Sequence, residues 1–100
     1  MSIVDKVRAI LDELDILTAD EIAERFRNIG IKGLRMQGSI CPIANYVKFL
    51  LPQVEDFYTC GSFSIWSVNG VSMADERGYG GGVMDFINKF DRKTYEDLIA

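Results

Sequence analysis

The first half of the chain has the spacing of apolar residues that is typical of amphipathic helices. Over residues 2–14, apolar positions recur every three or four residues with charged residues between them, which predicts a first helix. Residues 18–21, Thr-Ala-Asp-Glu, are a capping-box sequence, and Gly30 stands where a left-handed C-terminal cap is favoured. These signals predict a second helix that forms an antiparallel hairpin with the first.

A central helix is predicted to begin at Pro42, after a loop. Residues 30–40 contain three glycines and no helical period. Proline is tolerated in the first turn of a helix because an amide at that position would have no partner within the helix. An apolar stripe follows from Ile43 to Leu51, and Pro52 ends the helix.

The second half predicts a β-hairpin and then a return to helix. Residues 63–68 have the pattern of a strand, and Asn69-Gly70 favours a two-residue turn because both turn positions need positive φ. After the glycine-rich residues 77–82, helical spacing resumes to about residue 90, and residues 94–97 favour one last turn. The register of the hairpin places four side chains on one face: Trp66, Val68, Val71 and Met73.

These elements predict a single α+β domain over residues 1–100. It comprises an N-terminal helical hairpin, a central helix, one antiparallel β-hairpin and one or two C-terminal helices. A chain of 100 residues is long enough for one modest core and too short for two. The expected core consists of Val7, Leu11, Leu14, Ile22, Phe26, Cys41, Ile43, Val47, Leu50, Phe63, Ile65, Ile87, Phe90 and Leu98.

The composition, 48% apolar and 26% charged, is that of a soluble globular protein. No apolar stretch approaches the roughly 18 residues of a membrane span. The first residues mix charged with apolar positions, unlike a signal peptide. We therefore expect a cytoplasmic protein that does not contact a membrane and that keeps Cys41 and Cys60 as free thiols.

The chain contains no histidine, and this restricts its chemistry. Ser-His-Asp and Cys-His catalysis are excluded, and the commonest general base and zinc ligand are missing. Cys41 directly precedes the predicted helix start, where the helix dipole lowers a thiol pKa, so a small thiol-dependent enzyme is one hypothesis. The strongly apolar segment after Cys41 favours an inert core thiol instead. We expect no enzyme, no cofactor and no metal.

The net charge of −4 is unevenly distributed. Residues 1–24 carry two basic and seven acidic side chains, residues 25–54 carry five basic and no acidic ones, and residues 55–100 carry four basic and eight acidic ones. The three segments therefore have net charges of −5, +5 and −4. The basic block is expected to complement the acidic ends of the chain itself or to bind an acidic partner.

The basic block also allows a second hypothesis, a winged-helix-like DNA-binding protein. Residues 17–31, "LTADEIAERFRNIGI", resemble the second helix of a winged helix-turn-helix, and the downstream hairpin resembles a wing. The connection from Gly30 to Cys41 is much longer than the turn of that motif, however, and the whole chain is acidic. We therefore expect nucleic acid to be a less favoured partner than protein.

The glycine run before the last predicted helix has two interpretations. Free amides at a helix start can hold an anion, and Arg77 and Tyr79 stand beside the run. The run lacks the Lys-Ser/Thr of a P-loop and the spacing of a dinucleotide fingerprint. A flexible start to the helix is therefore the favoured interpretation.

Two stretches, "CPIANYVKF" and "VMDFINKFDRKTYEDLI", together with the hairpin between them, resemble a set of small proteins common in actinobacteria and their bacteriophages. Those proteins share a Cys-Pro-Ile/Val-Ala segment and a C-terminal Phe-Asp…Tyr…Leu pattern, and the resemblance covers residues 30–99. This chain has Lys93-Thr94 where the family often has a glycine before the final aromatic residue. The resemblance implies a bacterial or bacteriophage cytosolic origin and no known catalytic residues.

The function hypothesis is a non-catalytic cytosolic interaction protein, encoded by a phage or mobile element, that modulates a host macromolecule through surface contacts. A host protein is the expected partner. Arginines and aromatic residues dominate contact energies, and they occur in two places. The predicted contact residues are Arg27, Lys32 and Arg35 in the basic strip, or Trp66, Arg77 and Tyr79 near the hairpin and the glycine run.

Overall fold

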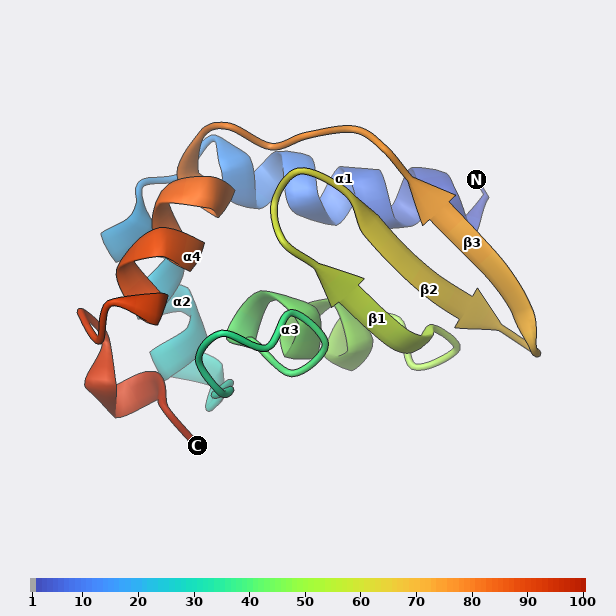
Figure 1. Ribbon diagram of the computed structural model, residues 1–100. Helices are drawn as coiled ribbons and strands as arrows, with labels where there is room; N and C mark the ends of the chain where they lie inside the picture. The colour runs from blue at the N-terminus through green and yellow to red at the C-terminus, as the bar shows by residue number, and fades with distance from the viewer. Residues whose placement is uncertain (1) are drawn as a thin grey trace.

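The computed structural model describes residues 2–100, which form four α-helices, a three-stranded sheet and a short 3-10 helix (Figure 1). The predicted α+β class, with N-terminal helices, a central helix, a β-hairpin and C-terminal helices, is confirmed. The elements in chain order are α1 (Ile3–Asp15), α2 (Ala19–Ile29), α3 (Pro42–Leu50), β1 (Glu55–Thr59), β2 (Ser64–Val68), β3 (Val71–Asp75), α4 (Gly82–Asp91) and η1 (Glu96–Leu98).

Local signals set the ends of the helices. The Thr18 hydroxyl accepts a hydrogen bond from the Glu21 amide at 3.1 Å, and the Glu21 carboxylate accepts one from the Thr18 amide at 3.0 Å, as the capping box predicts. Gly30 caps α2 with a left-handed φ of 77°. Pro42 occupies the first turn of α3, and Cys41 is its N-cap residue.

The sheet is antiparallel throughout, with strand order β1-β2-β3. The predicted register of the hairpin is confirmed: Trp66 pairs with Met73 across β2 and β3, and the turn residues Asn69 and Gly70 have φ of 52° and 78°. The sequence pattern did not predict β1. A bulge near Asp56, whose φ is also 52°, interrupts this strand and hides its alternation.

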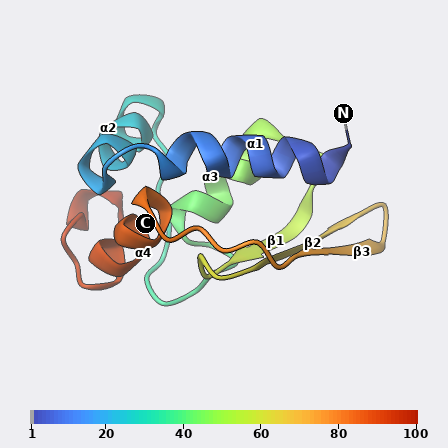
Figure 2. The same cartoon turned by 90° about the horizontal axis from the view of Figure 1, so that it is seen from above.

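The helices pack against one face of the sheet, which we call the inner face. Figure 2 shows α1 and α3 on that side, α4 beyond one end of the sheet, and no element on the opposite, outer face. Two side chains from the inner face, Phe57 and Trp66, stack in the core with ring centroids 5.7 Å apart. The sheet therefore has one buried face and one face open to solvent.

A second centre of the core is aromatic and joins α2, α3, α4 and the C-terminal segment. The Phe86 ring lies 5.8 Å from Phe90 and 5.3 Å from both Tyr95 and Phe26, measured between ring centroids. Phe26 in turn lies 5.1 Å from Tyr46. Offset and edge-on pairs at these separations add to the stabilisation that burial provides.

Three residues of the predicted core are exposed: Leu50, Phe63 and Ile65. Phe63 and Ile65 have the opposite parity to Trp66, so they point to the outer face once Trp66 points inward. Leu50 lies in the last turn of α3 and faces solvent. Ile87, also predicted for the core, is only half-buried at its margin.

The glycine run allows α4 to approach the connection between α1 and α2. The Asp15 carboxylate accepts hydrogen bonds from the Gly81 and Val83 amides, both at 3.1 Å, and so caps α4 from another helix. A Cβ on Gly82 would collide with the Leu17 carbonyl, and one on Gly81 would come within 2.7 Å of the Asp15 carbonyl. These glycines therefore permit close packing. The Asp15 carboxylate already accepts hydrogen bonds from the amides of Gly81 and Val83, which an anion would otherwise use.

Arg8 of α1 fastens the helical layer to β3. Its guanidinium donates two hydrogen bonds of 3.0 Å to the carboxylate of Asp75, whose side chain is almost fully buried. These bonds hold the pKa of Asp75 below its usual value, and the Arg77 amide adds a further bond to the same carboxylate. A buried carboxylate without such a partner is strongly destabilising.

We predict that Asp15→Ala lowers the free energy of unfolding by about 1 kcal/mol, the typical contribution of a helix cap, because two amides of α4 lose their acceptor. Asp15→Asn is the matched control: it removes the charge and keeps an oxygen acceptor, so its loss should be smaller. Urea denaturation followed by circular dichroism measures both. Equal stability of Asp15→Ala and wild type would contradict the cap.

We predict that Arg8→Met destabilises the protein most at neutral pH. A lowered carboxylate pKa contributes stability above the unfolded value of about 4, and that stability is lost as pH falls through the folded pKa. The difference in unfolding free energy between wild type and Arg8→Met should therefore narrow below about pH 4. Arg92→Met, which removes an arginine bonded only to the Asn88 carbonyl, is the control. A difference in unfolding free energy that does not change with pH would contradict the stabilising role of the Arg8–Asp75 pair.

Candidate protein-binding face

Four apolar side chains lie together on the open side of the sheet, and we call Met36, Tyr58, Phe63 and Ile65 the outer-face patch. Tyr58 and Ile65 are register partners in β1 and β2, and the Tyr58 ring lies 5.8 Å from that of Phe63. Met36 lines the same cavity as Tyr58. Phe63 is 41%, Ile65 45% and Met36 76% exposed, so the patch is available to a partner.

The loop before α3 is fixed against β1, and this fixes Met36 beside the strand. The Met36 amide donates a hydrogen bond of 3.0 Å to the Asp91 carboxylate at the end of α4. The Gly38 carbonyl accepts one of 3.1 Å from the Thr59 amide. Gly38 must lack a side chain here, because a Cβ would come within 2.6 Å of the Tyr58 ring. The patch therefore depends on contacts from three parts of the chain.

A cavity of about 180 Å³ lies between this loop, the end of β1 and α4. It adjoins the patch, because Met36 and Tyr58 belong to both. Both thiols and the Asp91 carboxylate line it, but these three side chains are not arranged so that they could hold one metal ion. Its lining residues are Met36, Gln37, Gly38, Cys41, Tyr58, Thr59, Cys60, Ile87 and Asp91.

Cys41 is a buried N-cap thiol. Its sulfur accepts a hydrogen bond from the Ala44 amide at 3.4 Å and donates one to the Gly38 carbonyl at 3.8 Å. Burial raises the pKa of Cys41, and the nearby Asp91 carboxylate raises it further, against the opposing effect of the Ala44 amide. The thiol therefore stays protonated at neutral pH and caps the helix, as the core interpretation of Cys41 requires.

The acidic ends of the chain pair with two arginines of the basic block. Arg25 bonds Glu13 at 2.7 Å. Arg27 bonds Asp97 at 2.5 Å and Glu24 at 3.3 Å, and the hydrogen bond to Asp97 raises the pKa of Arg27. This arrangement fits the interpretation in which the basic block complements the protein's own acids.

Other members of the basic block bond to backbone carbonyls. Arg35 donates to the carbonyl of Asp91 at 2.8 Å, and Lys48 donates to the carbonyl of Ser39 at 2.8 Å. Lys32 is exposed. Arg27, Lys32 and Arg35 are therefore not gathered into a set of free cations, since two of the three are engaged within the fold.

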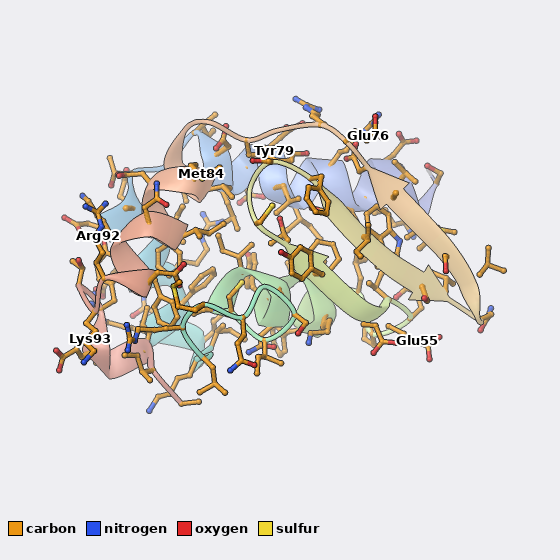
Figure 3. All side chains as sticks on the ribbon, viewed as in Figure 1. Glu55, Glu76, Tyr79, Met84, Arg92 and Lys93 are labelled. Atoms are coloured by element: carbon orange, nitrogen blue, oxygen red, sulfur yellow. The ribbon has the colours of Figure 1, made fainter. Side chains whose placement is uncertain are left out.

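The second predicted contact surface is largely internal. Trp66 and Tyr79 are buried in the core, so neither ring is offered to a partner. Burial raises the pKa of Tyr79 to about 12. Arg77 lies 5.4 Å from the centre of the Tyr79 ring and bonds Asp12 at 2.8 Å. Figure 3 shows Tyr79 on the segment that joins β3 to α4.

Two hollows that adjoin the outer-face patch are each lined by one carboxylate. Asp91 lines the adjoining cavity, and Asp56 lines a shallow groove of about 350 Å³ beside Ile65 on the same face. No lysine or arginine lines either hollow among the described residues. Glu55 and Glu76 lie at two margins of the sheet (Figure 3).

Sequence reasoning placed Phe63 and Ile65 in the core and did not single out Met36 or Tyr58. One signal in the sequence would have corrected the first error. Next to the turn, the hairpin face that carries Trp66 has four large apolar residues, with Ser64 and Asp75 only at its far end, whereas the face of Ile65 has two serines and an alanine. The more apolar face is the one that a single helical layer covers.

Comparison with known proteins finds no matching family model, no matching curated protein and no matching solved structure. Among residues 2–100, no helix is both long and apolar enough to cross a membrane.

We predict that iodoacetamide modifies Cys60 before Cys41 in the native protein. Cys60 is only half-buried, whereas Cys41 is buried and its pKa is raised, so thiolate is scarce and inaccessible there. Mass spectrometry of peptides from protein alkylated at about pH 8, with a urea-unfolded sample as control, measures both rates. Faster modification of native Cys41 than of unfolded Cys41 would contradict the inert-thiol interpretation and favour a thiol-dependent enzyme.

Proposed function

We propose that this protein is a non-catalytic binding protein that holds a partner protein through the outer-face patch. One observation carries the proposal: Met36, Tyr58, Phe63 and Ile65 adjoin one another on a sheet face that no helix covers. Contiguous exposed apolar residues with polar ones around them mark interaction surfaces. Aromatic residues and methionine are enriched in the buried centres of such interfaces.

The partner we propose is a host protein with an apolar segment flanked by lysine or arginine. The acidic residues around the patch, Asp56 and Asp91 among them, support basic flanks because they would steer and orient such a partner. Following the resemblance of the segment 41–44 and of the C-terminal pattern, we also propose that the protein is phage- or mobile-element-encoded and acts in the bacterial cytoplasm.

Two other functions have less support. A DNA-binding surface needs free cations for phosphates, and Arg25 and Arg27 already pair with carboxylates that a duplex would have to displace. A thiol-dependent enzyme needs an accessible thiolate, and burial raises the pKa of Cys41. Neither cost applies to the outer-face patch, because its side chains are uncharged and three of the four are exposed.

We predict that Phe63→Ser/Ile65→Ser abolishes capture of the partner without unfolding the protein. Both side chains are partly exposed and lie outside the core, so each change should lower the unfolding free energy by only about 1 kcal/mol. The experiment uses four immobilised baits in nuclease-treated bacterial lysate: wild type, the patch variant, Phe49→Ser and Arg27→Ala/Arg35→Ala. Phe49 on α3 is the matched control, because it is a phenylalanine 59% exposed outside the patch.

The expected result is one or more proteins retained by wild type, Phe49→Ser and the arginine variant and lost from the patch variant. Retention of the same proteins by the patch variant would contradict the proposal. Loss from the arginine variant, with steeply salt-dependent binding of duplex DNA by wild type, would instead favour the DNA-binding hypothesis.

A further inference from the structure

The two edges of the sheet differ in how they are protected. At the β1 edge, a bulge interrupts the register between Glu55 and Tyr58, and the loop at Gly38 bonds the Thr59 amide. Bulges and covering loops are means by which proteins prevent an edge strand from pairing with another chain. The β3 edge has neither: its register with β2 is regular over five pairs, and no backbone hydrogen bond from outside the sheet reaches residues 71–75 within residues 2–100.

Two residues of β3 direct their backbone groups outward. Val68 and Val71 flank a two-residue turn, so they exchange both ladder hydrogen bonds, and such pairs recur at every second position along the hairpin. Ser72 and Ala74 are the residues between these positions. Their N–H and C=O groups therefore point away from β2, toward the free edge of the sheet. The backbone of another strand could form hydrogen bonds with these groups.

The free edge carries no charge that would repel a second copy. Residues 71–74, Val-Ser-Met-Ala, include none of the lysines or prolines that commonly block an edge strand. Two of the three charges that follow are paired within the chain: Asp75 bonds Arg8 at 3.0 Å, and Arg77 bonds Asp12 at 2.8 Å. The third, Glu76, is exposed. Residues 71–74 themselves are therefore uncharged, although the whole chain has a net charge of −4.

We propose that β3 is the pairing edge for a second copy of this chain. Ser72 and Ala74 flank Met73 symmetrically, so a two-fold axis at Met73 places Ser72 opposite Ala74 of the second copy, and Ala74 opposite its Ser72. Each of these pairs exchanges both ladder hydrogen bonds. The product is a continuous antiparallel sheet of two copies, and Val71, which is 60% exposed in one copy, lies at the new junction.

This dimer has a consequence for binding, although the inference rests on the edge alone and does not require the proposed partner. Residues opposite one another in an antiparallel pair point to the same side, so both outer-face patches face the same way. A dimer therefore presents two patches to a repetitive or dimeric partner, which raises the effective affinity. Because five residues per strand make a small interface, we expect a weak dimer with a dissociation constant on the order of 100 µM.

The test is sedimentation equilibrium of the purified full chain from about 20 µM to about 1 mM, at low and high salt. The expected result is a monomer at the low end and a dimer at the high end, with tighter association at high salt because salt screens the repulsion between two chains of net charge −4.

Ser72→Lys/Ala74→Lys should weaken the dimer at least about tenfold, because each new lysine faces another across the axis. Gln53→Lys/Ser62→Lys, the control, adds the same charge at two exposed positions away from β3 and should dimerise more than the edge variant.

Amide hydrogen exchange of the wild-type protein supplies a second measurement that needs no variant. The Ser72 and Ala74 amides should exchange at least about fivefold more slowly at 1 mM than at 20 µM, because they become bonded only in the dimer. A monomer at all concentrations would overturn the proposal. So would a dimer that leaves these two amides unprotected, or one that Ile65→Ser abolishes while Ser72→Lys/Ala74→Lys does not.

Discussion

The contact between Asp15 and the first turn of α4 determines where much of the structure lies. By accepting the Gly81 and Val83 amides, the carboxylate docks α4 against the connection between α1 and α2. The far end of α4 then carries Asp91, which holds the loop before α3 at Met36. The candidate face therefore depends on an interaction at the opposite end of α4. Weakening the contact between Asp15 and α4 is expected to loosen the bond between Asp91 and Met36.

One helical layer on a three-stranded sheet explains both the stability and the proposed function. The inner face supplies Phe57 and Trp66 to the core, and Arg8 fastens the layer to the buried Asp75. None of the helices among residues 2–100 covers the outer face, so the apolar residues there are exposed (Figure 2). Exposed apolar area of this kind is retained in soluble proteins chiefly where a partner covers it.

The sequence allowed prediction of features that depend on neighbouring residues and not of those that depend on distant ones. The capping box at Thr18, the left-handed Gly30 and the register at Asn69-Gly70 are local, and they were predicted correctly. Which face of the hairpin is buried depends on the side that the distant helices cover. The prediction that Ile65 lies in the core was therefore wrong. The site escaped prediction for the same reason, because residues 36–38 are held beside β1 by bonds to the distant residues Asp91 and Thr59.

We propose that a partner protein binds the outer face of the sheet. The most direct measurement is amide hydrogen exchange of the protein with and without a partner captured by the wild-type bait. The account predicts slower exchange at residues 36–38, 56–58 and 63–67 in the complex, with little change in α2. Protection concentrated at residues 25–35, with the sheet unchanged, would contradict it.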